Sequence, residues 1–456
     1  MANKKAKYED WKAPERITCY YTNWSRYREA RSPGDSFVPL DTPVDLCSHI
    51  VYSFFPLNDK GAVAYSDGWA DFTKTDWSDP NNALGGIDDF MSLKGKGKVK
   101  NASFSVGGWT YSGPDVGATF NWRVVQKIPN TKPYQQIWDE MLKSPLARMR
   151  FIVSVEEIAE RHGFDGIDID YEYPGCPQGQ CSEQYAHQRE NFVQLLKELR
   201  ESMGDKFTIS VACSASPAVV KQGPNMKEVS KYADILNVMS YDYHVAIEPV
   251  TGHNQPKTGT SDNFDVETTF KLYVQELGVD PAKLNIGIPL YGRGFHVTME
   301  DYVKALESKQ FSGIKSLGPS NEMITTLEQG TGSEIEFCRE PAKGEISNYV
   351  GNEGSWLAWT EKPGYMQKGA DGNPTMPPHW IYTDENERGT LFAYTDLQDL
   401  KALDEIRQRY KLGGVMWYAI DQDDFKGKCK LPPGASPIMR AMLELPKYDK
   451  NFYPLP

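Results

Sequence analysis

Eight short apolar runs recur along the chain, and their number and order constrain the fold more than any other feature. Their residues are nearly continuous in apolar character and often β-branched, which is typical of strands that are covered on both faces. Segments with helical periodicity separate several of the runs, so strands and helices alternate. The runs are residues 17–23, 48–55, 99–108, 164–173, 207–214, 235–241, 283–290 and 413–420.

This alternation predicts a parallel α/β fold, and eight strands are the number that closes a (β/α)8 TIM barrel. An open, doubly wound sheet is the alternative, but no GxGxxG motif follows the first run. Three of the intervening segments have helical periodicity and end at Gly163, Gly204 and Gly413, where glycine favours a helix C-terminus.

The regular spacing breaks once, between Leu290 and Gly414, which more than 100 residues separate. Residues 296–390 contain Gly, Ser, Pro and Trp with weak periodicity. Because structureless loops of this length are uncommon in compact domains, we expect a small α+β domain inserted between strands seven and eight. The barrel then comprises residues 1–295 and, for its last strand and helix, residues 391–456.

Charge and apolar patterning argue against two classes of partner. The chain has 50 basic and 62 acidic residues, a net charge of −12, which repels phosphate backbones and disfavours a nucleic-acid partner. No run of about 18 apolar residues exists, so we expect no membrane span. The first 16 residues contain lysines but no apolar segment, so we do not expect this segment to be a secretory signal peptide.

Seven cysteines occur without any CxxC pair, which leaves a zinc ribbon or a thioredoxin-type site unsupported. The odd number leaves at least one free thiol. Cys213 lies within an apolar run and is expected to be that buried thiol. Cys176 and Cys181 flank a short loop and could form a local bridge. On these grounds alone, oxidising and reducing compartments both remain open.

The segment 164–173 carries a row of acidic residues, Asp168, Asp170 and Glu172, at every second position. On a strand this spacing points all three side chains to one face, and the apolar residues between them point to the other. In a barrel the acidic face is the interior, with Glu172 nearest the C-terminal mouth. Like charges this close raise at least one pKa, which suits a general acid. Asp165 lies on the opposite parity and is expected to be structural.

A metal site for Mg²⁺ or Ca²⁺ is the main alternative for the acid row, and a solvated acidic edge is a weaker one. His162 and His187 do not share the acidic parity, which disfavours Zn²⁺. Aromatic residues make up 12% of the chain, and several lie at predicted C-terminal strand ends. Because aromatic faces stack on the C–H faces of sugars, the combination favours a carbohydrate over a phosphate. These strand-end residues include Trp109, Met239, Tyr241, Tyr243, Tyr291 and Trp417.

At these positions the chain resembles the family 18 glycoside hydrolases, the chitinase family. Residues 165–172 fit the family signature DGxDxDxE, residues 105–108 fit its SxGG motif, and residues 239–242 fit M-x-Y-D. Residues 414–424 resemble the last barrel strand with its floor tryptophan. The resemblance runs from Arg16 to the C-terminus, and the insertion falls where the family's α+β insertion lies.

The resemblance implies retaining hydrolysis with assistance from the substrate's own acetamido group. Glu172 is then the general acid and base, Asp170 holds the acetamido N–H, and Asp168 shares a proton with Asp170. Tyr241 donates to the acetamido oxygen, and Trp417 forms the floor beneath the sugar at the cleavage site. The remaining residues implied to line the substrate are Tyr20, Trp24, Phe54, Gly107, Gly108, Trp109, Met239, Asp242, Tyr291 and Arg293.

The implied activity is that of a chitinase, cutting β-1,4 bonds between N-acetylglucosamine units of chitin or chito-oligosaccharides, with endo action. No metal or cofactor is implied, and we expect a monomer. A non-catalytic chitin-binding lectin and an endo-β-N-acetylglucosaminidase for N-glycans are the alternatives. All three acids and Tyr241 are present, which argues against the lectin, and the insertion with its aromatic cleft argues for linear chitin.

The resemblance also implies disulfides between Cys19 and Cys47 and between Cys338 and Cys429. Together with a Cys176–Cys181 bridge, these pairs leave Cys213 free. The pairing and the family indicate a secreted, extracellular origin.

Overall fold

The computed structural model describes most of the barrel and parts of the insertion. The described residues are 11–30, 36–72, 85–121, 126–245, 247–308, 310–319, 331–333, 355–360, 388–395, 397–427 and 435–448.

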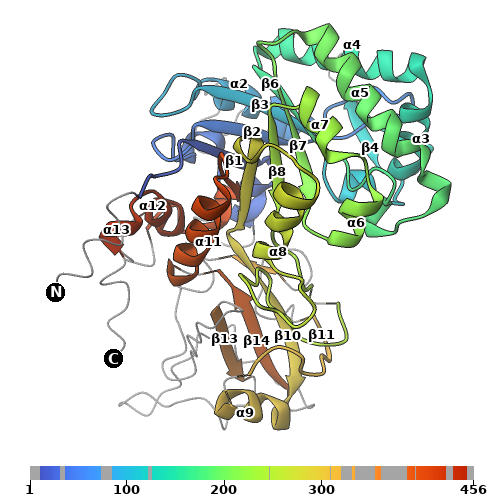
Figure 1. Ribbon diagram of the computed structural model, residues 1–456. Coiled ribbons are helices and arrows are strands. Elements are labelled where there is room, and N and C mark those ends of the chain that lie inside the picture. The colour runs from blue at the N-terminus through green and yellow to red at the C-terminus, as the bar shows by residue number, and fades with distance from the viewer. Residues whose placement is uncertain are drawn as a thin grey trace.

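The eight predicted strands form a closed barrel of parallel strands, which confirms the expected fold (Figure 1). Each strand pairs in parallel with both neighbours, in the order β1-β15-β9-β8-β7-β6-β3-β2, and β2 closes the ring on β1. The strands are β1 (Arg16–Thr22), β2 (His49–Phe55), β3 (Asn101–Gly107), β6 (Gly166–Asp170), β7 (Thr208–Ser214), β8 (Ile235–Met239), β9 (Leu284–Pro289) and β15 (Gly414–Tyr418).

Helices surround the barrel, and their apolar sides bury the outward-facing residues of the strands in one large core. The three predicted helices that end at Gly163, Gly204 and Gly413 correspond to α4, α5 and α11. The Ser144 side chain caps the N-terminus of α4 by accepting from the Ala147 N–H at 3.3 Å. The helices are α1 (Gly68–Phe72), α2 (Gly86–Met91), α3 (Tyr134–Lys143), α4 (Pro145–His162), α5 (His187–Met203), α6 (Pro217–Gln222), α7 (Met226–Tyr232), α8 (Val266–Lys271), α11 (Leu397–Tyr410), α12 (Pro437–Leu443) and α13 (Leu445–Tyr448).

A second, antiparallel sheet lies between the seventh and eighth barrel strands in the sequence, as expected, and Figure 1 shows it with α9 (Met299–Ser308) below the barrel. It begins at Tyr291 and its last described strand ends at Tyr394, so it extends past both ends of the segment 296–390. A small core that includes Phe295 and Leu391 supports it. Its strands are β10 (Tyr291–Thr298), β11 (Gly318–Pro319), β12 (Thr331–Ser333), β13 (Ser355–Thr360) and β14 (Arg388–Tyr394).

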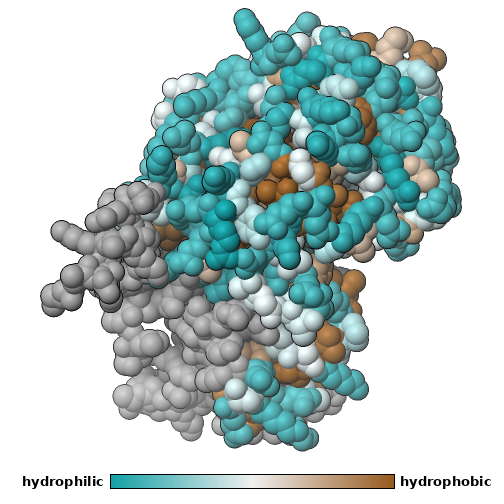
Figure 2. All heavy atoms as spheres, in the orientation of Figure 1, coloured by the Kyte–Doolittle hydropathy of each residue, from teal (hydrophilic) through white to brown (hydrophobic). Residues whose placement is uncertain are grey.

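On the coloured part of the face shown in Figure 2, hydrophilic residues predominate and smaller groups of hydrophobic residues lie between them. A short antiparallel pair, β4 (Ala118–Asn121) and β5 (Gln126–Pro129), lies outside both sheets. Among the helices the structure describes, none is both long enough and apolar enough to cross a bilayer.

The interior of the barrel is unusually polar. Barrel interiors are commonly filled by branched aliphatic side chains. Here, buried hydroxyl, amide and carboxyl groups from different strands meet around the centre of β6. They belong to Thr18, Tyr20, Ser105, Asp168, Ser210, Asn237 and Asn285, all at most 3% exposed.

Candidate active site

The acid row lies on the interior face of β6 and continues just beyond its C-terminal end. Asp168, Asp170 and Glu172 are 0%, 4% and 7% exposed. Ile167 and Ile169, which alternate with the two aspartates, belong to the outer core under the helices. The strand alternation inferred from the sequence therefore holds, and it brings three carboxyl groups together at the mouth of the barrel.

Asp168 is the most strongly hydrogen-bonded of the three acids. Ser105 donates to its Oδ2 at 2.7 Å and Tyr20 to the same oxygen at 2.8 Å. Ser210 donates to Oδ1 at 2.6 Å, and the Asn237 amide approaches that oxygen at 3.4 Å. Burial raises the pKa of Asp168, and these four hydrogen bonds oppose the rise because they favour the carboxylate.

Asp170 has the opposite environment. It is buried, and its Oδ1 has no hydrogen-bond partner within the described part of the chain. Burial, then the charges of Glu172 and Asp168, raise the pKa of Asp170 well above its ordinary value. Of the two aspartates, Asp170 is therefore the one better suited to carry a proton at neutral pH.

The backbone of Glu172 is held from both sides. Its N–H donates to Ser112 Oγ at 3.0 Å, and its carbonyl accepts from the Gln178 N–H at 2.8 Å. Gln178 lies within the loop closed by Cys176 and Cys181, and its side chain donates to the Trp109 carbonyl at 2.6 Å. The disulfide loop thus links the position of Glu172 to that of Trp109, which is 54% exposed at the rim.

Aromatic side chains cluster around the mouth of the barrel. Tyr241 stacks on Tyr418 with ring centroids 6.0 Å apart, and Tyr291 meets Tyr241 edge-on at 6.0 Å. Trp24 stacks on Phe54 at 6.0 Å. The cluster consists of buried Tyr20, Val51, Phe54, Tyr241, Tyr291 and Met416, with Trp24, Tyr111, Met239 and Tyr418 packed against it. It forms an aromatic wall beside the acid row.

The insertion contributes directly to this wall. Tyr291 and Arg293 are on β10, the first strand of the antiparallel sheet. The Arg293 guanidinium pairs with Asp242 Oδ1, with Nε at 2.8 Å and a terminal nitrogen at 2.7 Å. The second sheet is therefore tied to the end of β8 at the mouth.

The expectation that Trp417 forms the floor of the site is wrong. Trp417 is 0% exposed and packs in the outer core with the helices. Side chains alternate along β15, so Met416 and Tyr418 face the interior and Trp417 faces away from it. Tyr418 contacts Tyr20 at 5.8 Å and Tyr241 at 6.0 Å between ring centroids and takes the position that the sequence assigned to Trp417.

Gly107 and Gly108 have a structural requirement in addition to their expected contact with substrate. Gly107 has φ +111°, and a Cβ there would lie 2.2 Å from the Asp170 carbonyl oxygen. The Gly108 N–H donates to that oxygen at 2.7 Å. A side chain at Gly107 would displace the C-terminal end of β6.

Four residues of the site were not predicted from the sequence to be functional. Ser210, Asn237 and Asn285 share the interior parity of their strands, and Gln178 lies in the disulfide loop. Ser210, Asn237 and Asn285 are each a polar residue within an apolar run, and this pattern could have identified them as interior polar groups. The structure also explains Asp165, which pairs with Lys94 and accepts from the Ala102 N–H at 3.1 Å, away from the acid row.

No described group of three or more His, Cys, Asp or Glu side chains is arranged to hold a metal ion. Asp168 instead accepts hydrogen bonds from hydroxyl and amide donors. Such donors stabilise a carboxylate, whereas Mg²⁺ or Ca²⁺ needs oxygen atoms free to bind the ion. The residues present thus fit proton chemistry better than the metal alternative.

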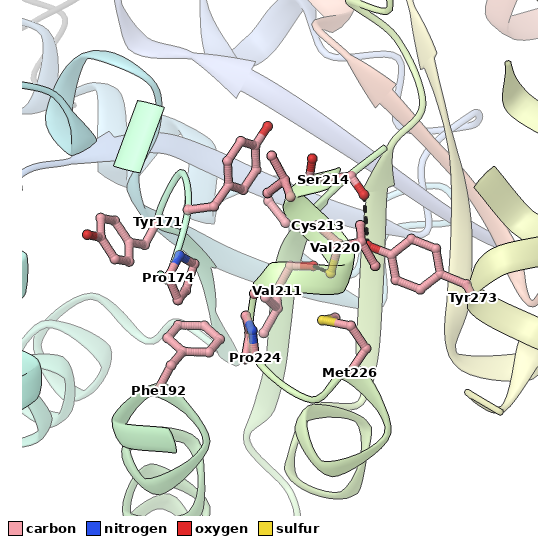
Figure 3. A pocket seen from close by; sticks show the side chains of 14 residues that line it. Tyr171, Pro174, Phe192, Val211, Cys213, Ser214, Val220, Pro224, Met226 and Tyr273 are labelled. Carbon is pink, nitrogen blue, oxygen red and sulfur yellow. Dashed lines mark hydrogen bonds between the residues drawn. The ribbon is translucent and has the colours of Figure 1, made fainter. Parts of the chain in front are cut away.

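Two of the three expected disulfides are present, Cys19–Cys47 and Cys176–Cys181, and Cys213 is a buried free thiol. Cys338 and Cys429 lie outside the described residues. Figure 3 shows Cys213 in an apolar pocket with Met226 and Phe192, between β7 and the helices. Burial, then the nearby aspartates, raise the pKa of the Cys213 thiol, which keeps it protonated and unreactive.

If the third pair also forms, six of the seven cysteines are bonded and one thiol remains. We therefore expect one thiol per chain when denatured, non-reduced protein is titrated with a chromogenic disulfide reagent. Reduced protein serves as the control and should titrate all seven cysteines. Three thiols would contradict the Cys338–Cys429 pair, and six or seven would contradict the whole pairing.

Comparison with known proteins agrees with the architecture. The family model described as Glycosyl hydrolases family 18 matches residues 16–423. The chain is 29% identical over 443 residues to a Drosophila melanogaster protein named Probable chitinase 10. The matched region covers 94% of this chain but only 16% of that protein.

Solved structures give the same relationship. The catalytic domain 2 of a Group II chitinase from Ostrinia furnacalis has 25% identity and a TM-score of 0.72, covering 96% of this chain and 98% of that one. Human YKL-39, described as a pseudo-chitinase with retained chitooligosaccharide binding, has 21% identity and a TM-score of 0.68, covering 95% and 99%. The fold is thus shared by a chitinase and by a pseudo-chitinase.

Proposed function

The chain belongs to family 18 of the glycosyl hydrolases, and we propose that it is an endo-acting chitinase. Its substrate is then chitin or chito-oligosaccharides, cut at β-1,4 bonds between N-acetylglucosamine units with retention of configuration. The proposal concerns the activity of this chain, since longer relatives contain other parts that it does not span.

The observation that carries the proposal is the buried Oδ1 of Asp170, which lies between two further acids and has no hydrogen-bond partner among the residues that the structure describes. A buried oxygen without a partner costs free energy, on the order of 1–3 kcal/mol, unless a ligand supplies a donor. The N–H of an acetamido group is such a donor, and it belongs to the sugar whose glycosidic bond lies beside Glu172 in the proposed complex. A sugar without this group leaves Asp170 unpaired.

In the proposed mechanism Glu172 donates its proton to the glycosidic oxygen as the bond to C1 breaks. The acetamido carbonyl oxygen of the same sugar attacks C1 and gives an oxazolinium ion, which the negative charge of the aspartate pair stabilises. Tyr241 donates to the acetamido oxygen and orients it for attack. Glu172, now a carboxylate, takes a proton from water, and the water oxygen attacks C1 and opens the ring.

The aromatic wall supports a sugar polymer as the substrate. Trp24, Trp109 and Tyr418 are partly exposed around the acid row, where flat faces can stack on successive sugar rings. Tyr291 and Arg293 bring the insertion to the same mouth. We propose that Tyr20, Phe54, Met239 and Asp242 complete the lining with these residues.

A chitin-binding lectin is the second candidate, because YKL-39 has this fold and is described as a pseudo-chitinase. The complete acid row and Tyr241 favour the enzyme over the lectin. An endoglycosidase acting on N-glycans would use the same acids and differs only in the chain it accepts.

The test is hydrolysis of N-acetylchitohexaose followed by NMR of the new reducing ends within the first minutes. We expect internal cleavage and β-anomeric products, since two successive inversions at C1 retain the configuration. Predominantly α-anomeric products would contradict the acetamide mechanism. Binding without any cleavage would support the lectin, and cleavage of N-glycans alone would support the endoglycosidase.

We further propose that the protein works in an oxidising, extracellular compartment as a monomer without a cofactor. The two described disulfides support this location, because structural disulfides are rare in the reducing cytosol.

A further inference from the structure

A chain of side-chain hydrogen bonds leads from Asp168 down the interior of the barrel to Arg16. Arg16 Nε donates to Asn285 Oδ1 at 2.8 Å. Asn285 Nδ2 donates to Asn237 Oδ1 at 2.9 Å, and Asn237 Nδ2 reaches the Tyr20 hydroxyl at 3.2 Å and Asp168 Oδ1 at 3.4 Å. The two asparagines are 0% exposed, so the chain runs through the barrel core.

Neighbouring strands bring these residues together by register. Arg16 pairs with Gly414, Gly414 with Asn285, and Asn285 with Asn237. A Cβ at Gly414 would lie 2.6 Å from Asn285 Oδ1, so the glycine leaves the space that the amide occupies. The hydrogen-bonded chain is therefore a feature of four adjacent strands rather than an isolated contact.

The chemistry of Arg16 fixes the direction of every bond in the chain. A guanidinium can only donate, so the Asn285 atom facing it must be the oxygen. The Asn285 amide nitrogen then faces Asn237 and Thr18, donating to Thr18 Oγ1 at 3.0 Å. The Asn237 oxygen is thereby used as an acceptor, which leaves its nitrogen to face Asp168.

We propose that Arg16 acts through Asn285 and Asn237 as a positioning residue that keeps Asp168 in its carboxylate form, so that the shared proton resides on Asp170. The proposal rests on the proposed hydrolase function and names a role for residues remote from the substrate. In this role Arg16, at the opposite end of the barrel, keeps a negative charge on Asp168.

The charged and titratable groups around the two ends are consistent with this role. Asp168 is faced by Asp170 and Glu172 from its own segment, by Tyr20 from β1 and by Cys213 from β7. None of these neighbours carries a positive charge. The carboxylate form of Asp168 is therefore favoured by its hydrogen-bond donors, Tyr20, Ser105, Ser210 and Asn237.

At the other end, Arg16 also donates to the carbonyls of Ala282 at 2.8 Å and Leu284 at 3.2 Å. Asp280 and His49 are the titratable groups near it. Burial lowers the pKa of Arg16 to about 10, which leaves it cationic at neutral pH, and burial with the charges of Arg16 and Lys100 lowers the pKa of His49 to about 4. Arg16 is thus the cationic end of the hydrogen-bonded chain.

The test is the pH dependence of kcat/KM for Arg16→Met and Arg16→Lys. Methionine removes the donor, so the Asn285 and Asn237 amides can reverse and present an oxygen to Asp168. We expect the acidic limb of the kcat/KM profile to move up by about one pH unit. The reason is that losing one hydrogen bond to a carboxylate raises its pKa by about one unit. Lysine also only donates and should retain most of the wild-type profile.

Arg200→Met is the matched control. Arg200 donates to the backbone carbonyls of Tyr232 and Phe207 and pairs with Asp234, and none of these described partners binds the acid row. It should lower stability to a similar extent without moving the acidic limb. An unchanged limb in Arg16→Met, or an equal shift in Arg200→Met, would overturn the proposal.

Infrared titration of the protonated carboxyl band separates this proposal from the proposed function. If the wild-type chain binds chito-oligosaccharides but does not cleave them, the hydrolase assignment fails. The difference in this band between a chain and the same chain carrying Asp168→Asn removes the background of the other acids among the 62 and still reports the titration midpoint of Asp168. We expect that midpoint to rise in Arg16→Met. Asn237→Leu, which removes the last donor, should give the same direction if Arg16→Met does not fold, and no rise in either variant contradicts the inference.

Discussion

Replacing Glu172 with glutamine is expected to lower kcat/KM on N-acetylchitohexaose by about 10³-fold, within the usual range for loss of a general acid and base. Glutamine has nearly the shape of glutamate but has no proton to give to the glycosidic oxygen. The backbone hydrogen bonds of Glu172 to Ser112 and Gln178 involve main-chain atoms and survive the change. Binding of the hexamer should therefore persist, as measured by calorimetry at substrate concentrations near the wild-type KM.

Asp165→Asn is the matched control for this substitution. Asp165 belongs to the same signature, yet its carboxylate pairs with Lys94 and accepts from a backbone N–H at the other end of β6. Its loss should lower stability modestly and leave the rate per folded molecule within a few-fold of wild type. Turnover retained in Glu172→Gln would remove Glu172 from the proposed role, as would an equally large loss in Asp165→Asn.

The barrel could be predicted because each strand and helix carries its own local signal. The eight runs are short, apolar and separated by segments of helical period, and a ring of parallel strands follows from their number. The acid row could also be predicted, because alternation on one strand places Asp168, Asp170 and Glu172 on the same face.

The partners of the acids could not be assigned from local patterns. Asp168 is bound by residues from β1, β3, β7 and β8, and the contacts depend on the register between those strands. A sequence shows that Ser210 and Asn237 are polar within apolar runs, but not that both reach Asp168 Oδ1. The course of β10 into the aromatic wall likewise depends on how the second sheet packs, which composition and weak periodicity do not reveal.

Trp417 shows a different kind of error. The resemblance to the family's last barrel strand implied that Trp417 is the floor beneath the sugar. The same alternation that placed the acids puts Trp417 on the outer face of the barrel. Counting from Gly414, whose close approach to Asn285 marks the interior, assigns Met416 and Tyr418 to the inner face. Parity along the strand is thus a stronger guide than residue type when a motif offers two adjacent aromatic residues.

The adjacent residues Trp417 and Tyr418 should therefore respond to substitution in opposite ways. Trp417→Ala removes a fully buried ring from the outer core and is expected to lower the free energy of unfolding by about 3–5 kcal/mol. Tyr418→Ala removes a half-buried ring from the mouth and should cost less stability, but lower kcat/KM roughly tenfold through the lost stacking face. Denaturant unfolding and hexamer kinetics, measured on the same preparations, distinguish the two effects.

Conservative variants make the contrast independent of misfolding. Trp417→Phe keeps an aromatic ring in the core and should retain near-wild-type activity per folded molecule with a smaller loss of stability. Tyr418→Phe keeps the stacking face and separates the ring from its hydroxyl, so most of the activity should remain. If Trp417→Phe lost activity at unchanged stability while Tyr418→Ala remained fully active, Trp417 would be the floor residue and the orientation of β15 described here would be wrong. The opposite result would assign the sugar-facing aromatic position of this chain to a tyrosine, one residue beyond the tryptophan that the motif suggests.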